Sequence, residues 1–190
     1  PAFAPIITTG IGTTFIGYNA GYQSSGQYSV IIGDRAFDAS TDSTSSSNVI
    51  IGANAGGAVN SAYSSDNIFI GYDAGLGGSG RIHSSIAIGR NAMKSTAANA
   101  VTGQIAIGME ALSALTSGDA NLAIGYEAMK VHTTGNRNMA IGYGAMNDTD
   151  VGSTSLGSND NIFMGYDAGG GTWADAASQY NVGIGNYVMD

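Results

Sequence analysis

The feature that most constrains this chain is a repeat centred on the dipeptide Ile-Gly, which returns in ten units over 190 residues, once with Met in place of Ile. The copies stand at Ile16-Gly17, Ile32-Gly33, Ile51-Gly52, Ile70-Gly71, Ile88-Gly89, Ile107-Gly108, Ile124-Gly125, Ile141-Gly142, Met164-Gly165 and Ile184-Gly185. Their spacings are 16, 19, 19, 18, 19, 17, 17, 23 and 20 residues. Ala follows the Gly by three residues in nine copies, and Val188 takes that place in the tenth. Self-similarity at such a period predicts a repeat architecture.

Inside each repeat the apolar residues alternate with a period of two. Leu122 and Ile124 fall on one side of a short strand, and Ala123 falls on the other. Segments rich in Ser, Thr, Asn and Asp separate the repeats, as in residues 40–48, and indicate loops. We therefore predict an all-β parallel β-solenoid of about ten coils, roughly 45 Å long at ~4.8 Å per coil. Residues 1–10 are predicted to be an extended lead-in, and residues 11–190 a single solenoid domain.

Both sides of each predicted strand are apolar. Because an exposed ladder of such residues exceeds the apolar patch that monomers tolerate, we predict that one side fills the coil and the other packs against further copies. Closed cyclic symmetry then favours a homotrimer. The predicted trimer interface is the central residue of each strand: Phe15, Ile31, Ile50, Phe69, Ala87, Ala106, Ala123, Ala140 and Phe163.

The sizes of these central residues suggest a shape for the trimer. Bulky side chains at both ends and Ala in the middle predict that three rods approach most closely around the fifth to eighth coils. Ala123→Asp is expected to prevent assembly, whereas Ser45→Asp, in a predicted loop, is expected to be silent. Met in the position after the Ala (Met93, Met129, Met146 and Met189) is predicted to fill the core.

Units of the form N-x-A-I-G-x-x-A, with Gly118 or Gly135 shortly before the Asn, resemble the head repeats of YadA-type trimeric autotransporter adhesins. Those heads form a left-handed parallel β-roll in which three chains pack along one axis. The variants FIGYNAG, FIGYDAG and AIGYEAM also resemble repeats of bacteriophage tail-fibre and receptor-binding proteins. The resemblance covers residues 11–190, although these repeats vary more in length than adhesin head repeats do.

This resemblance implies a function in attachment. The expected protein is a non-enzymatic trimeric module, most simply a phage tail-fibre or receptor-binding domain, with an adhesin head as the alternative. It would lie outside the cell, on a virion or a bacterial surface, and bind a surface polysaccharide or protein.

A third reading is enzymatic, because I-G-x-x-A-x also fits the hexapeptide repeat of left-handed β-helix acyltransferases. Those enzymes place an aliphatic residue every six positions, whereas here the residues six before and after the Ile are mostly polar or irregular. They also need a catalytic His. His83 and His132 fall in predicted loops without an acidic partner, so we predict that both are solvated side chains and not catalytic bases. We predict no catalytic residue and no cofactor. Asp and Glu are scattered singly among the loops, so no glycosidase pair of carboxylates can be identified within one chain. Two subunits together could supply such a pair, and a depolymerase site between subunits is kept as an alternative for that reason.

Charge and composition narrow the partners further. The net charge is −8 with only six Lys and Arg, so nucleic acid is not an expected partner. The chain has no Cys, and no metal site is predicted. No apolar run approaches the ~20 residues of a membrane span, so no membrane insertion is expected.

The candidate binding residues are aromatic. Tyr follows the Gly in five repeats, at Tyr18, Tyr72, Tyr126, Tyr143 and Tyr166. This strip either stacks on sugar rings or a protein partner, or forms a structural ladder along the groove between subunits. Trp173, in GGGTWADAASQY, is predicted either to contact a partner or to pack over a coil end. The insertion at 147–160 and the Ser-rich loop at 38–48 widen single coils, and binding specificity is expected in such loops.

Overall fold

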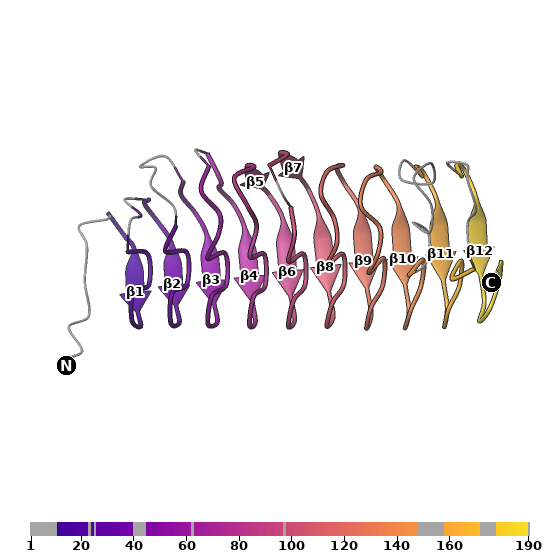
Figure 1. Ribbon diagram of the computed structural model, residues 1–190, viewed down its shortest axis with the longest axis horizontal. Coiled ribbons are helices and arrows are strands. Elements are labelled where there is room, and N and C mark those ends of the chain that lie inside the picture. The colour runs from indigo at the N-terminus through magenta and orange to yellow at the C-terminus, as the bar shows by residue number, and fades with distance from the viewer. Residues whose placement is uncertain are drawn as a thin grey trace.

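The chain winds into one elongated stack of coils, each built around one Ile-Gly repeat (Figure 1). The computed structural model describes residues 11–22, 24, 26–39, 45–61, 63–96, 98–147, 158–171 and 178–189. Ten strands form one parallel sheet: β1 (Thr14–Ile16), β2 (Val30–Ile32), β3 (Val49–Ile51), β4 (Ile68–Ile70), β6 (Ile86–Ile88), β8 (Ile105–Ile107), β9 (Leu122–Ile124), β10 (Met139–Ile141), β11 (Ile162–Met164) and β12 (Val182–Ile184). A second sheet pairs β5 (Ile82–His83) with β7 (Val101–Thr102).

This arrangement confirms the predicted all-β parallel solenoid, with one strand of the large sheet for each repeat. Among the described residues no helix is long and apolar enough to cross a membrane. The predicted lead-in, residues 1–10, lies outside the part of the chain that the structure describes.

All ten strands share one register, so each Ile-Gly pair lies over the next. Ile107, Ile124 and Ile141 are successive partners in the ladder. The Gly after each Ile has φ between 130° and 143°, a conformation that side chains rarely adopt. A Cβ on Gly125 would also overlap the carbonyl oxygen of Gly142 in the next coil. The dipeptide recurs because both the turn and the close approach of backbones require Gly.

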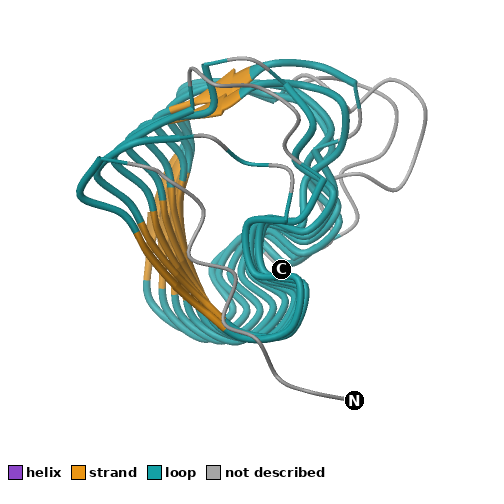
Figure 2. Ribbon diagram, turned by 90° about the vertical axis from the view of Figure 1, so that its left-hand side faces the viewer, coloured by secondary structure: helices purple, strands orange, loops and turns teal. Residues whose placement is uncertain are grey.

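The coils stack around one common interior (Figure 2). The core lies in this interior, and it is lined by the central residue of every strand of the large sheet except β12, where that residue is Gly183. Ala123 and Phe163 have no exposed surface in the single chain, and neither do most of their counterparts. The prediction that Phe15, Ile31, Ile50, Phe69, Ala87, Ala106, Ala123, Ala140 and Phe163 form a trimer interface is therefore wrong. Their side chains are covered by the chain's own coil and have no surface left to contact another copy.

The alternation of Phe and Ala at these positions has a cause within each coil. The residue six positions after the central one also points into the core, and the two share one space. Where the strand carries Phe69, the later residue is Gly75, whose added Cβ would lie 2.5 Å from the Phe69 ring. Where the strand carries Ala87, Ala123 or Ala140, the later residue is the buried Met93, Met129 or Met146. The small central residues thus do not indicate closer rods in the middle of the stack.

The three buried methionines confirm the prediction that they fill the core, whereas Met189 in the last coil is 51% exposed. The prediction that Ser45 lies in an open loop is wrong. It has no exposed surface, and its Oγ donates to the carbonyl oxygen of Ser61. Ser45→Asp would therefore bury a carboxylate, and it is not expected to be silent.

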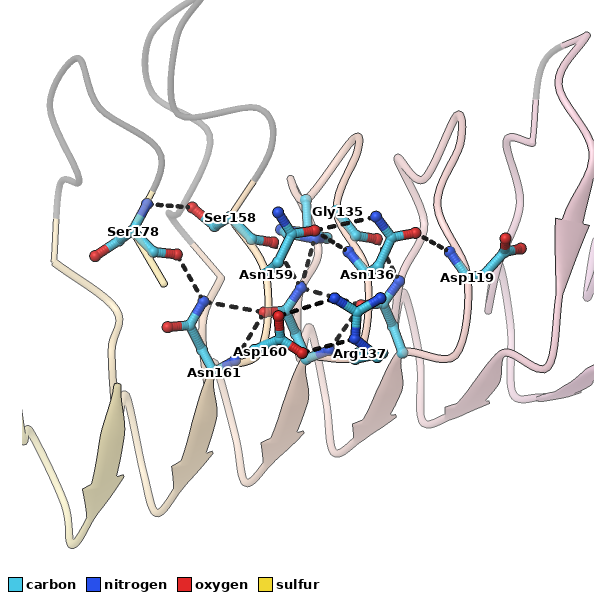
Figure 3. Close-up of polar contacts among 12 residues, drawn as sticks. Asp119, Gly135, Asn136, Arg137, Ser158, Asn159, Asp160, Asn161 and Ser178 are labelled. Carbon is cyan, nitrogen blue, oxygen red and sulfur yellow. Dashed lines mark hydrogen bonds and ion pairs between the residues drawn. The ribbon is translucent and has the colours of Figure 1, made fainter. Parts of the chain in front are cut away.

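Polar side chains inside the coils are paired in a ladder that runs along the stack, three residues before each Ile. Asn138 shows the pattern: its Oδ1 accepts from the backbone N–H of Asn161, and its Nδ2 donates to the carbonyl oxygen of Ser158. In the next coil Nδ2 of Asn161 donates in the same way to the carbonyl oxygen of Ser178 (Figure 3). The ladder continues through Ser29, Asn48, Asn67, Ser85, Gln104, Asn121, Asn138, Asn161 and Asn181. These amide and hydroxyl side chains satisfy backbone groups that a buried turn would otherwise leave unpaired.

Candidate binding surface

A partly exposed apolar surface runs along the outer side of the large sheet. In each strand the first and third residues point outward, and they are only partly covered by their neighbours above and below. In β9 these residues are Leu122 and Ile124. Nineteen of the twenty outward positions are aliphatic or Met, Thr14 being the exception. We call these two columns the outer face.

Sequence reasoning recognised both apolar sides of the strands but exchanged the inner and the outer one. A period of two separates the sides without saying which is inside. The signal that distinguishes them is the residue six positions after the strand centre, which is Gly when the centre is Phe and Leu or Met when the centre is Ala. Such reciprocal sizes indicate two side chains that share one enclosed space.

The predicted tyrosines extend the outer face by a third column. Tyr126, Tyr143 and Tyr166 stack with ring centroids 4.9 and 5.1 Å apart and interplanar angles of 14° and 11°. Tyr187 closes the stack with an edge contact to Tyr166 at 5.2 Å. The three stacked rings remain 37–48% exposed. The predicted ladder of stacked tyrosines is thus present in the C-terminal coils.

Stacking limits what these three rings can bind. Tyr143 is covered on both faces by Tyr126 and Tyr166, so it presents only its edge and its hydroxyl group. A hydrogen bond to Glu127 raises the pKa of Tyr126, and the charge of Asp167 raises the pKa of Tyr166.

Tyr18 and Tyr72 stand apart from this stack. The neighbours of Tyr72 in the column are Ala53 and Arg90, as the backbone hydrogen bonds between coils place them. Its side chain is 55% exposed, and that of Tyr18 is 62% exposed. Because a sugar ring stacks on an aromatic face, Tyr72 suits that role better than the rings of the stack do.

Beside the tyrosine column lies a cluster of paired charges. Lys130 Nζ contacts Glu110 at 2.8 Å and Glu127 at 3.1 Å, and Arg90 lies 3.9 Å from Glu110. The hydrogen bond from Lys130 lowers the pKa of Glu110, and the same contact raises the pKa of Lys130. A glycosidase acid needs a raised pKa, so Glu110 has the opposite of what that role requires.

Both histidines differ from their prediction as solvated loop residues. His132 is fully buried, and its Nε2 lies 3.3 Å from Nδ2 of Asn138 in the amide ladder. His83 lies in β5 with its Nε2 3.8 Å from Asp66 Oδ2, so it does have an acidic neighbour. The two histidines lie in different coils, and Nδ1 of His83 is buried without a hydrogen-bond partner among the described residues.

Other candidates stay untested. Trp173 lies outside the described residues, as do residues 40–44 and 148–157 within the two predicted binding loops. Among the described residues no group of three or more His, Asp or Glu side chains is arranged to hold a metal ion. In comparisons with known proteins, no family, curated protein or solved structure matches this chain.

Proposed function

We propose that the chain is a non-enzymatic attachment module that works as a homotrimer, as part of a phage tail fibre or receptor-binding protein. The observation that carries this proposal is the outer face, two apolar columns that run over all ten strands and that a single chain covers only in part. Burying such a face between copies in a closed symmetric assembly removes an apolar surface that is long for a monomer.

The resemblance to YadA-type head repeats and to tail-fibre repeats supports the same function. The repeats that carry Tyr after the Gly favour the phage protein over the adhesin head. In this proposal the rod acts outside the cell, and it binds a polysaccharide or protein of the bacterial surface through its loops and its open tyrosines. A membrane-anchor barrel and a coiled-coil stalk in flanking sequence would instead identify an adhesin.

The test is binding of the purified protein to a glycan array and to whole bacteria. A variant with a shortened loop makes this test specific. The ends of the loop are set by equivalent positions in adjacent coils: Lys130 corresponds to Asn147, and Gly135 corresponds to Ser158. Residues 148–157 are therefore replaced by the four residues that stand at 131–134. We expect the variant to sediment as the same oligomer as the original chain and to lose cell binding.

Two results would contradict the proposal. A folded protein that binds no glycan and no cell surface would remove the attachment function. Heat released on titration with acetyl coenzyme A would instead support the acyltransferase reading, and calorimetry measures it directly.

A further inference from the structure

We propose that the space over Ala53, between Tyr72 and Asp34, is a binding site for one neutral hexose residue of a glycan. The inference rests on the attachment function proposed above, and it deepens that function by naming one site and the class of sugar that it takes. The site belongs to the tyrosine column, which is the residue two positions after the Ile of each repeat.

Ala53 is the one position of the tyrosine column at which the side chain ends at Cβ. Successive members of the column lie over one another, because the residue after each member donates its N–H to the carbonyl oxygen of the member one coil before. Asn54 donates in this way to Asp34, and Asp73 donates to Ala53. The column reads Tyr18, Asp34, Ala53, Tyr72, Arg90, Met109, Tyr126, Tyr143, Tyr166 and Asn186.

The gap over Ala53 has the thickness of one ring. Where Tyr126, Tyr143 and Tyr166 occupy adjacent coils, their ring centroids lie 4.9 and 5.1 Å apart, so one coil of the column corresponds to one stacked ring. Tyr72 and Asp34 lie two coils apart, and only the methyl group of Ala53 stands between them in the column. A single sugar ring therefore fits one coil before Tyr72 without displacing a side chain of the column.

Tyr72 supplies an open aromatic face to this gap. The ring is 55% exposed and makes no ring contact with another described residue. Its other side faces the coil of Arg90, whose Nη2 lies 3.9 Å from Glu110 in the coil beyond. The face of a hexose that carries C–H bonds is apolar and packs against such a ring, while its hydroxyl groups point away.

The backbone beside Tyr72 is held from both neighbouring coils. Asp73, the next residue, is buried, and its Oδ1 accepts from Nδ2 of Asn54 at 2.8 Å. Its Oδ2 lies 3.3 Å from Nζ of Lys94 in the following coil. A platform that is fixed before the ligand arrives costs less ordering on binding.

Asp34 supplies the polar group on the opposite side of the gap. Its side chain is exposed, and its Oδ2 lies 3.4 Å from Nε of Arg35. Its Oδ1 accepts no hydrogen bond from a described residue. A carboxylate accepts hydrogen bonds from sugar hydroxyl groups, and these bonds are stronger than those between neutral groups. The same charge repels an acidic sugar, so the site is suited to a neutral hexose.

Saturation-transfer NMR on the purified protein tests this site. The probes are the methyl glycosides of glucose, galactose and mannose, with methyl glucuronide as the acidic control. Ala53→Tyr fills the gap with the side chain that five other repeats carry at this position, so the fold should remain intact. Met109→Tyr is the matched control, because it adds the same side chain to the column on the far side of Arg90. Circular dichroism and urea unfolding check both variants.

We expect saturation of the aromatic protons to reach at least one of the three neutral hexosides, most strongly at the C–H protons of one ring face. Ala53→Tyr and Tyr72→Ala should abolish this transfer, whereas Met109→Tyr should leave it unchanged. Asp34→Ala should weaken binding roughly tenfold or more, because a hydrogen bond to a charged group is lost.

Absence of transfer to all three hexosides, or unchanged transfer in Ala53→Tyr, would overturn the site. Unchanged transfer in both Tyr72→Ala and Asp34→Ala would overturn it as well, whatever the stability of Ala53→Tyr. Tighter binding of the glucuronide would overturn the choice of neutral sugars. In each of these cases binding to the glycan array or to whole bacteria would leave the proposed function standing. Binding to neither would overturn both the site and that function.

Discussion

At the scale of single residues, this fold depends on paired sizes inside each coil. Phe69 faces Gly75, and Phe163 faces Gly169, whose added Cβ would lie 2.8 Å from the ring. Coils with Ala at the strand centre fill the same space with Leu or Met. Phe37 follows the rule across coils, since it lies against Gly56 in the next coil. A large side chain in this space is thus accompanied by a small one, either in the same coil or in the next.

This exchange predicts that two damaging substitutions compensate each other. Phe69→Ala leaves a cavity and should cost about 3–5 kcal/mol of unfolding free energy. Gly75→Met alone should also destabilise, because its side chain has no room beside Phe69. The double variant resembles the fifth coil, where Ala87 faces Met93, and Met93 adopts φ of 49° without Gly. Urea unfolding should show a double variant more stable than the sum of the two losses. Simple additivity would contradict the shared space.

The recurring Gly gives a second prediction at this scale. Gly125→Ala would combine an unfavourable φ with overlap against the Gly142 carbonyl oxygen. Gly185 has the same backbone conformation, with φ of 133°, but no atom lies within 4 Å of its Cβ position. Gly185→Ala should therefore cost only the backbone strain, about 1–3 kcal/mol. Gly125→Ala should cost clearly more in the same urea unfolding measurement. Equal losses would mean that the approach of neighbouring coils does not select this Gly.

At the scale of elements, each strand is short and its stability depends on the coils beside it. The sequence predicted the position of every strand of the large sheet, because Ile-Gly marks where each strand ends. It could not predict β5 and β7, whose two-residue strands carry no alternation, nor that His132 is buried against Asn138. Those features depend on which residues of different coils meet.

The amide ladder gives the prediction for this scale. Asn138→Ala removes the acceptor for the Asn161 N–H and the donor for the Ser158 carbonyl oxygen. Each buried group left unpaired costs about 1–3 kcal/mol. Asn181→Ala is the control, because this half-buried side chain belongs to the last rung and should lose only about 0.5–1.5 kcal/mol. Hydrogen exchange should show faster exchange in the coils beside Asn138. An unchanged exchange pattern there would contradict a role for the ladder in holding coils together.

At the scale of the whole molecule, the outer face and the core lie one residue apart along every strand. Which face is inside could not be settled from the alternation alone, and the trimer interface was predicted on the wrong one. In this fold a change at Ala123 acts on the core of one chain, whereas a change at Ile124 acts on the surface that copies are proposed to share. Neighbouring residues can therefore separate folding from assembly.

The comparison of Ala123→Asp with Ile124→Asp makes that separation measurable. Ala123 is fully buried, so its replacement places a carboxylate in the core and should abolish the cooperative unfolding transition. Ile124 is only partly covered in the single chain, so Ile124→Asp should keep the β-sheet signal in circular dichroism. It would place one carboxylate from each copy in a shared apolar seam, and sedimentation should report folded monomer. A stable trimer of Ile124→Asp would exclude the outer face as the contact between copies. A folded Ala123→Asp chain would contradict the buried position of Ala123 and reopen the first assignment of the two faces.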